Sequence, residues 1–340
     1  MHQIESTIKR FLNHRKAPQT PCLIAVSGGA DSVALLRVMV TCIPDTSQLK
    51  VAHFQHGTRP DSVHDQVWVA RLCAQLGVEF WTNAHKGVSQ YRVSDLESVT
   101  SAASQLVVAS EATLREQRYQ FLQDVARQSG CPYLLTAHHA DDQIETVVHH
   151  LLRGTGLRGL SGIPEHRQLS EDLELLRPLL TLRRKQILEY LESLGQDYLT
   201  DSTNFETTFT RNRLRHELLP LLAQFEPQFA EHLLELSEHA QEVQTYHQEL
   251  VLRVLGEAVL SRSADYVRLL SRPLQALPDF LIRETFVELW SQQKWSRGPM
   301  TRPDWERLAR LVHQEKGSES LPAQMFAERR AEMLVISQNA

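Results

Sequence analysis

The sequence predicts an α/β protein: a doubly wound, mostly parallel sheet followed by a smaller, mainly helical carboxyl-terminal domain. Short apolar runs alternate with stretches of helical periodicity up to about residue 150, which is typical of a parallel sheet with helices on both faces. The chain has 340 residues, 42% of them hydrophobic, enough for two buried cores. We therefore expect one domain over residues 1–220 and a second over 221–340.

The predicted elements follow in order along the chain. Ile4, Ile8, Phe11 and Leu12 recur at helical spacing and predict an amphipathic helix before the first strand. Four apolar runs predict strands, at 23–26, 50–55, 78–84 and 133–137. Helices are expected at 65–76, at 111–128 and from about Asp141. Segment 86–110 is polar and without clear period, so we interpret it as a surface insertion.

Composition narrows the class of protein. The net charge of −5 disfavours a protein that coats nucleic acid by bulk electrostatics, although a local basic face is compatible with it. The four cysteines include no Cys-x-x-Cys pair, which disfavours a disulfide framework and a zinc ribbon and favours reduced thiols. Without a signal-like segment or an apolar run of bilayer length, we expect a soluble, cytoplasmic protein with no membrane partner.

The first predicted strand runs directly into Ser27–Ser32, which reads SGGADS, and a helical stretch follows. Glycines let the backbone approach a charged ligand, and the serine hydroxyls and first helical amides donate to it. This segment resembles the pyrophosphate loop of ATP pyrophosphatases, although Ser-Gly-Gly alone is compatible with simple turn chemistry. Asp31 suits a position beside phosphate when a cation such as Mg²⁺ lies between them, so Asp31 is the first metal candidate.

A second polar cluster follows the fourth predicted strand, where 137–146 reads AHHADDQIET. Ligands of a doubly wound sheet bind at the carboxyl ends of its strands, so segments 27–32, 53–57 and 138–145 should meet in one crevice. Asp142 and Glu145 are three residues apart and share a helical face. A carboxylate pair near a helix N-terminus suits a metal or a cationic amine.

The same cluster allows two other interpretations. Its paired His and Asp residues are also typical of di-metal phosphohydrolases; the four in question are His138, His139, Asp141 and Asp142. Alternatively, Asp141 or Asp142 only caps the helix.

Several segments together carry a family resemblance. They are SGGADS, HFQHGTR at 53–59, EATLREQRYQF at 111–121, AHHADDQIET and RGTGLRGLSGI at 153–163, followed by RPLL at 177–180, DSTN at 201–204 and RNRLR at 211–215. In this combination the chain resembles the tRNA(Ile)-lysidine synthetases, which are PP-loop ATP pyrophosphatases with an adenine nucleotide alpha hydrolase-like fold. Enzymes that thiolate tRNA cytidines share the first loop but typically have Cys-x-x-Cys pairs, which this sequence lacks.

The resemblance implies an AMP-forming carbon–nitrogen ligase. Its substrates would be ATP, L-lysine and the isoleucine tRNA with a CAU anticodon. ATP would adenylate the wobble cytidine and release pyrophosphate, and the lysine side-chain amine would then attack C2 and expel AMP, leaving lysidine. Another AMP-forming modifier of a base or small molecule remains an alternative, as does a metal-dependent phosphohydrolase. A homodimer is one option for its assembly.

Chemistry and the motif match assign roles in the nucleotide site. The residues assigned to ATP are Ser27, Gly28, Gly29, Ala30, Asp31, Ser32, His53 and Arg153. Asp31 and Asp142 would hold Mg²⁺, and Asp142 or Glu145 would orient the lysine ammonium or accept its proton. Arg153 lies at a glycine-rich helix exit, which suits a loop closing over a nucleotide or a simple helix cap.

The remaining assigned residues are arginines. Arg115 is placed in the catalytic set and Arg118 in the substrate set, with a solvated helix face as the alternative for both. Arg211, Arg213 and Arg215 would contact an RNA backbone or ATP phosphate, with ion pairing to nearby acids as the alternative.

Beyond Pro220 the pattern changes. Residues 227–260 predict one long connecting helix, and helices at 278–293 and 303–315 precede short strand-like stretches at 325–326 and 333–336. The domain at 221–340 follows the first domain, as the substrate-binding domain does in the family that this chain resembles, so we expect the domain at 221–340 to bind tRNA. Arg329 and Arg330 are candidate RNA contacts there, and Trp295 is a candidate for stacking on a base.

Overall fold

The computed structural model describes residues 2–15, 20–55, 62–83, 89–91, 111–200 and 212–338. The chain divides into two units, Met1–Glu238 and His239–Ala340, and each is described by itself. The division falls inside helix α11 (Phe229–Ala258), whereas the sequence pattern changes near residue 220. Within the described ranges, no helix has the length and apolar character needed to cross a membrane.

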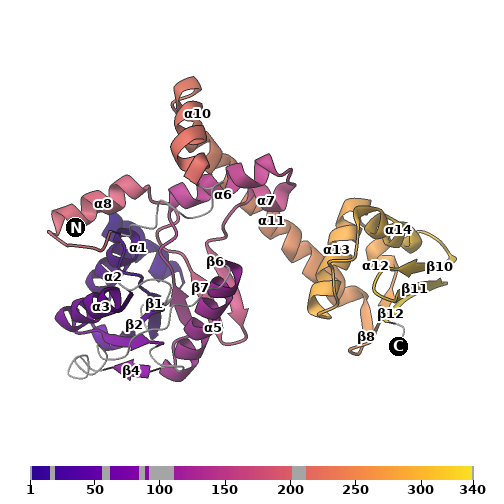
Figure 1. The fold of residues 1–340 in the computed structure, drawn as a ribbon. Helices are drawn as coiled ribbons and strands as arrows, with labels where there is room; N and C mark the ends of the chain where they lie inside the picture. The colour runs from indigo at the N-terminus through magenta and orange to yellow at the C-terminus, as the bar shows by residue number, and fades with distance from the viewer. Residues whose placement is uncertain are drawn as a thin grey trace. The chain divides into compact units, whose positions relative to one another are not determined.

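The first unit is built on a seven-stranded sheet of order β4-β3-β2-β1-β5-β7-β6 (Figure 1). Its strands are β1 (Cys22–Ala25), β2 (Leu49–His53), β3 (Glu79–Thr82), β4 (Ser89–Tyr91), β5 (Tyr133–Leu135), β6 (His166–Ser170) and β7 (Leu173–Leu176). The five inner strands are parallel, and β4 and β6 pair antiparallel at the two edges. The four predicted strands are confirmed as β1, β2, β3 and β5.

Helices connect these strands. They are α1 (Gln3–His14), α2 (Ala30–Cys42), the short η2 (Thr46–Gln48), α3 (Ser62–Leu76), α5 (Glu111–Ser129), α6 (Ala140–Leu152), α7 (Leu157–Leu160) and α8 (Arg184–Ser193). A π-helical turn, η6 (Leu214–Leu218), then leads into α10 (Leu219–Phe225) and α11.

Alternate strand residues enter different cores. Ile24 and Val51 pack with α1, α2 and α8 on one face of the sheet, and Leu23 and Ala52 pack with α5 on the other. Figure 1 shows α5 across the sheet from α1, α2 and α3. This double coverage explains why the inner strands are apolar throughout.

The strand order places a topological switch point between β1 and β5. From β1 the chain continues to β2 on one side, and β5 pairs with β1 on the other. In open α/β sheets the crevice at the carboxyl ends of such strands is the usual ligand site.

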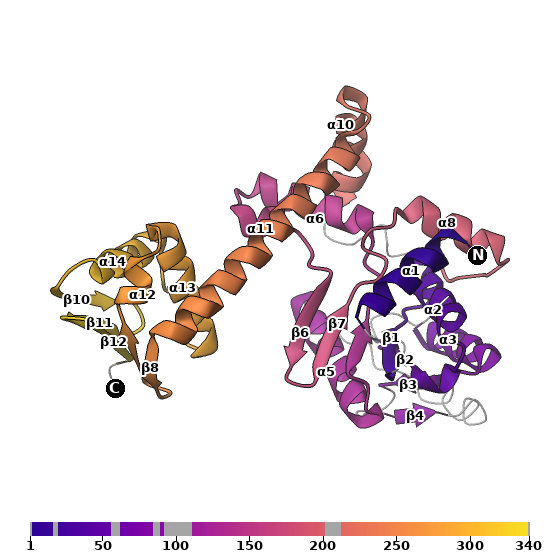
Figure 2. The same cartoon turned by 180° about the vertical axis from the view of Figure 1, so that it is seen from behind.

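The second unit contains a five-stranded antiparallel sheet of order β10-β11-β12-β9-β8 (Figure 2). Its strands are β8 (Val259–Arg262), β9 (Tyr266–Leu270), β10 (Lys316–Leu321), β11 (Met325–Arg330) and β12 (Met333–Gln338), and its helices after α11 are α12 (Arg272–Gln275), α13 (Asp279–Gln292) and α14 (Arg302–Val312). Helices α11, α13 and α14 and strands β11 and β12 correspond to predicted elements; β8, β9 and β10 were not predicted, so the sheet is larger than expected.

Two RNA-contact candidates in this unit are wrong. Trp295 is buried, its Nε1 donates to the Ala264 carbonyl at 2.8 Å, and its ring packs edge-on against Trp290. Arg329 is also buried, and its Nε donates to the Gln314 carbonyl at 3.2 Å. Both side chains are therefore used in packing.

Candidate active site

The SGGADS loop forms a tight cradle between β1 and α2. Gly28 has a φ of +97°, and a Cβ there would lie 2.7 Å from Leu199 Cδ1. The Leu199 amide donates to the Gly28 carbonyl at 2.9 Å. The Ser32 hydroxyl accepts from the Ser27 amide at 3.2 Å and donates to the Gly29 carbonyl at 2.9 Å. Gly29 is the N-cap of α2, so the amides of the first helical turn, beginning at the buried Ala30, lie beside this cradle.

His53 ends β2 next to this loop. Its side chain is buried, and Nδ1 lies 2.9 Å from the carbonyl oxygen of Val26. It therefore packs beside the SGGADS loop. The rest of the predicted turn, residues 56–59, lies outside the described residues.

His139 brings the two predicted clusters together. Its Nε2 lies 3.6 Å from Asp31 Oδ2 and 3.6 Å from Asp142 Oδ2, and its Nδ1 lies 3.7 Å from Asp141 Oδ2. Burial opposes the charge on His139, but attraction to Asp31, Asp142 and Asp141 outweighs it and raises the pKa of this imidazole. Burial likewise opposes ionisation of Asp31, yet His139 and Arg184 hold its pKa below the usual value. His139 and Asp31 therefore each favour the charged form of the other at the switch point.

The carboxylates beside the loop fit a magnesium ion. Asp31 Oδ1 is buried without a hydrogen-bond partner among the described residues, and oxygen is the ligand that Mg²⁺ prefers. Asp142 Oδ2 accepts from the His139 amide at 3.0 Å, which is the capping role considered above. Among the described side chains, no three His, Cys, Asp or Glu residues are arranged to hold a metal. An ion here would take further oxygens from a nucleotide, and the di-metal interpretation is not favoured.

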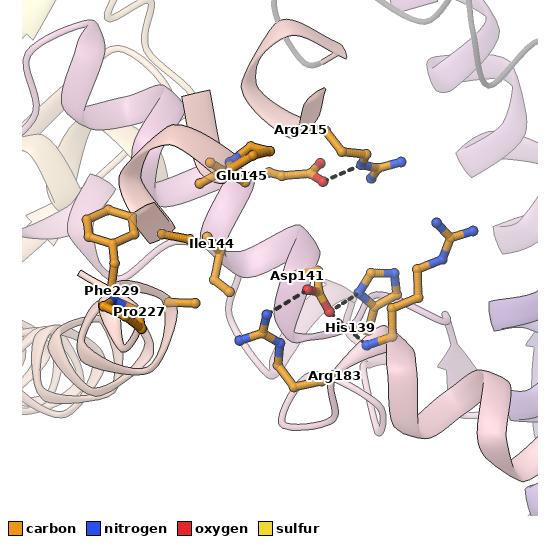
Figure 3. Close-up of a pocket in the computed structure, with 13 residues that line it drawn as sticks. His139, Asp141, Ile144, Glu145, Arg183, Arg215, Pro227 and Phe229 are labelled. Carbon is orange, nitrogen blue, oxygen red and sulfur yellow. Dashed lines mark hydrogen bonds and ion pairs between the residues drawn. The ribbon is translucent and has the colours of Figure 1, made fainter. Parts of the chain in front are cut away.

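Two arginines at the start of α8 complete the charged group, and neither was predicted from the sequence. Arg183 Nη2 lies 3.1 Å from Asp141 Oδ1, and the Arg184 amide donates to Asp141 Oδ2 at 2.7 Å (Figure 3). Arg184 Nε also lies 3.8 Å from Asp31 Oδ1. The sequence does contain an indication of their role. The helix dipole disfavours two cations at a helix N-terminus unless acids face them, so this arginine pair indicates nearby carboxylates.

Glu145 is buried on α6 and paired with Arg215. Its Oε1 accepts from Arg215 Nε at 2.6 Å. Arg213 Nε pairs with Glu217 Oε2 at 2.9 Å on the surface. Both arginines thus form the ion pairs considered as the alternative, and their contact with RNA stays a prediction. Arg211 lies outside the described residues.

A cavity of about 300 Å³ opens beside these pairs (Figure 3). One part of its lining is charged: His139, Asp141, Glu145, Arg183, Arg184 and Arg215. The other part is apolar: Ile144, Leu219, Pro220, Ala223, Pro227, Phe229 and Ala230. The apolar wall comes from α6, α10 and the start of α11 and was not predicted. A small ligand with a charged end and an aliphatic body suits this lining.

Arg115 and Arg118 lie in a second cationic cluster. Both guanidinium groups lie over the Tyr119 ring, at 5.1 and 5.7 Å from its centroid. The buried Arg177 Nη1 donates to the Pro164 carbonyl at 2.5 Å. Burial and the charges of Arg177, Arg118 and Arg115 lower the pKa of His138 to about 3, so its imidazole is neutral.

Arg153 is the C-cap of α6 and is exposed. Gly154 follows with a φ of +72°, and Gly156 is the N-cap of α7. The glycines therefore end one helix and begin the next, and nucleotide contact by Arg153 stays a prediction.

Comparison with known proteins agrees with this geometry. The PP-loop domain family matches residues 1–222. A tRNA(Ile)-lysidine synthase from Rhodopirellula baltica is 31% identical over 335 residues, covering 89% of this chain and 82% of that protein. A second relative, the tRNA(Ile)-lysidine synthase from Bacteroides thetaiotaomicron, is 34% identical over 251 residues. This match covers 73% of this chain and 54% of that protein.

A solved structure shares the fold. The U34-tRNA thiolase NcsA from Methanococcus maripaludis superposes with a TM-score of 0.55 at 15% identity, over 71% of this chain and 78% of that one. At this identity the likeness concerns the fold alone. The sequence matches go further, and the chain belongs to the PP-loop family and, within it, to the tRNA(Ile)-lysidine synthases.

Proposed function

We propose that the protein joins L-lysine to C2 of the wobble cytidine of the isoleucine tRNA with a CAU anticodon. Membership of the PP-loop family supports the use of ATP, and the relatives' name supports a tRNA(Ile) substrate. The observation that carries the lysine assignment is the cavity: its charged end combines the carboxylates of Asp141 and Glu145 with three guanidinium groups, which suits a zwitterionic amino acid, and its apolar wall suits an aliphatic stem.

In the first step, the cytidine C2 oxygen attacks the α-phosphorus of ATP, and the bond to pyrophosphate breaks. Ser27, Gly28, Gly29, Ala30 and Ser32 would hold the β- and γ-phosphates and stabilise the charge that develops on the leaving group. His53, packed beside the loop, would support the nucleotide site. Mg²⁺ held by Asp31 and Asp142 would neutralise phosphate charge.

In the second step, the lysine amine attacks C2, and the bond between C2 and the oxygen of AMP breaks. The amine must first lose a proton, because free lysine is protonated at neutral pH. Asp142 and Glu145 are the groups proposed to orient the ammonium, and one of them would take the proton. The Arg215 guanidinium, which donates to Glu145 Oε1, would orient that carboxylate.

The tRNA would contact several arginines of the first unit. Arg115 and Arg118 would bind the activated base or a phosphate, Arg153 the nucleotide, and Arg211 and Arg213 the RNA backbone. The carboxyl-terminal unit would supply further tRNA contacts, and the homodimer stays an option within this proposal.

The test uses purified protein with ATP, Mg²⁺, radiolabelled lysine and two tRNA transcripts that differ only in the anticodon. We expect label that survives alkaline deacylation on the CAU transcript alone, with an equal amount of AMP. Asp31→Asn should abolish AMP formation, whereas Asp45→Asn, which changes an exposed acid at the start of η2, should not. AMP or phosphate release that needs no lysine would reject the proposal and favour another PP-loop activity or a hydrolase.

A further inference from the structure

Helix α6 carries a buried polar network on the face that does not line the cavity. Gln143 follows Asp142, and its Nε2 donates to the Ser161 carbonyl at 3.1 Å and to Ser237 Oγ at 2.6 Å. Its Oε1 accepts from the Ile163 amide at 2.6 Å. Gln143 is 3% exposed and Ser237 1% exposed. Hydrogen bonds in such dry surroundings are costly to break, so this network is a firm connection.

One arm of the network holds the loop that follows α6. His150 Nδ1 lies 2.8 Å from the Gly159 carbonyl, and residues 143 and 150 lie two helical turns apart on one face. The loop is therefore fixed to α6 at two points. Gly162 has a φ of +62°, and a Cβ there would lie 2.6 Å from Gln143 Oε1. The amide of Gln143 can reach the loop backbone because residue 162 is glycine.

The other arm holds the beginning of α11. Ser237 lies two turns after Ala230 on the same face of α11. Ala230 and its neighbour Phe229 line the cavity. The bond from Gln143 to Ser237 therefore acts with the apolar packing between α6 and α11 to hold the apolar wall in place.

Glu145 lies on the opposite side of α6 from Gln143, because residues two apart on a helix do not face each other. It lines the cavity, whereas Gln143 does not appear in the lining. A single helix thus presents carboxylate to the cavity on one face and holds the cavity's far wall with the other.

We propose that Gln143 is a positioning residue for the lysine amine. Through Ser237 it helps to fix the distance between the carboxylates of α6 and the apolar wall on α11. This rests on the proposed function, in which the cavity takes lysine. The phosphate loop is held separately, by Leu199. Loosening the network should therefore weaken lysine binding and leave ATP binding unchanged.

The experiment compares Ser237→Ala and Gln143→Leu with Thr245→Ala in the full chain. Thr245 is a matched control, because its hydroxyl lies on the same helix and donates to the Gln241 carbonyl of that helix. We expect Ser237→Ala to raise the KM for lysine roughly three- to tenfold, the effect of one lost hydrogen bond, and Gln143→Leu to raise it further. The kcat and the KM for ATP should stay at their original values in Ser237→Ala.

Two results would overturn the inference. One is a Ser237→Ala protein that behaves like Thr245→Ala. The other is a uniform fall in kcat with both KM values changed, which general destabilisation would produce. A wild-type protein that makes no lysidine would instead reject the proposed function. Amide hydrogen exchange at Ile163 then still tests the network: exchange must accelerate in Gln143→Leu and not in Thr245→Ala, and an unchanged rate in Gln143→Leu rejects it.

Discussion

At the scale of single residues, Gly28 links the sequence motif to the backbone it requires. Its positive φ strains any residue with a Cβ, and its neighbour Leu199 occupies the space that a Cβ would need. We expect Gly28→Ala to lose ATP binding, measured by calorimetry, and to lower the free energy of unfolding by more than the roughly 1–2 kcal/mol of backbone strain alone.

Gly195→Ala separates the two causes. Gly195 has a φ of +58°, but a Cβ there would meet nothing within 4 Å. This variant should show the backbone strain without the steric clash and should keep ATP binding. Equal losses of stability in the two variants would mean that contact with Leu199 has no role.

The pKa values of the adjacent His138 and His139 shift in opposite directions, and His138 gives a pH prediction. Its pKa is about 3 in the folded protein and about 6.5 in the unfolded chain, so the unfolded state binds more protons between these values. Stability should therefore fall as the pH drops below about 6.5. Between pH 7 and pH 5, the free energy of unfolding measured in urea should fall less in His138→Gln than in wild type. As a control, replacement of the exposed His14 by Gln should leave the fall in stability as large as in wild type. If His138→Gln also shows the full fall, the lowered pKa of His138 is contradicted.

Whether a residue of the site could be predicted depends on whether it lies in a recognisable sequence motif. Asp31 and Asp142 lie in motifs at the ends of strands, so the sequence alone brings them to one crevice. Arg183 and Arg184 reach that crevice because α8 begins beside α6; two cations at a helix N-terminus indicate that acids face them, but not which acids. The apolar wall of the cavity was missed because no local pattern encodes it.

At the scale of elements, the Glu145–Arg215 pair joins α6 to η6. The carboxylate is buried and the guanidinium half-buried, so removing either partner leaves a charge in poor surroundings. We expect Arg215→Ala to lower the free energy of unfolding by about 1.5–3 kcal/mol, the range for a charged hydrogen bond. In the double variant Arg215→Ala/Glu145→Gln, the free energy of unfolding measured in urea should fall by less than the sum of the falls in the two single variants. Additive losses would show that the two side chains act independently.

The elements that were predicted are those with strong local patterns. The inner strands are apolar because both faces are buried, and α1 shows the amphipathic spacing of a surface helix. The β6–β7 hairpin was missed because β6 is largely exposed and polar. β10, which reads KGSESL, has a single buried apolar residue and is recognisable as a strand only by its pairing with β11.

At the scale of the whole molecule, the two units have separate cores. Trp290 is fully buried in the second unit, with Trp295 and Trp305 packed edge-on at 5.0 and 5.1 Å between ring centroids. Trp290→Ala should destabilise that unit by about 3–5 kcal/mol and leave ATP binding by the first unit unchanged. Near-ultraviolet circular dichroism during heating, together with ATP calorimetry, would measure both effects. Parallel loss of ATP binding would contradict the separation.

Helix α6 has little tolerance for sequence change. From Ala140 to Val148 all positions except Thr146 cap the helix, fill the core, line the cavity or anchor the loop and α11, whereas Leu151 and Leu152 near its end are 47% and 63% exposed. Random substitution along these thirteen residues would thus divide into an intolerant stretch and a permissive end. Because function and packing share the same short segment, an engineer who wants a different acceptor amine would do better to vary the wall on α10 and α11 than the helix that faces it.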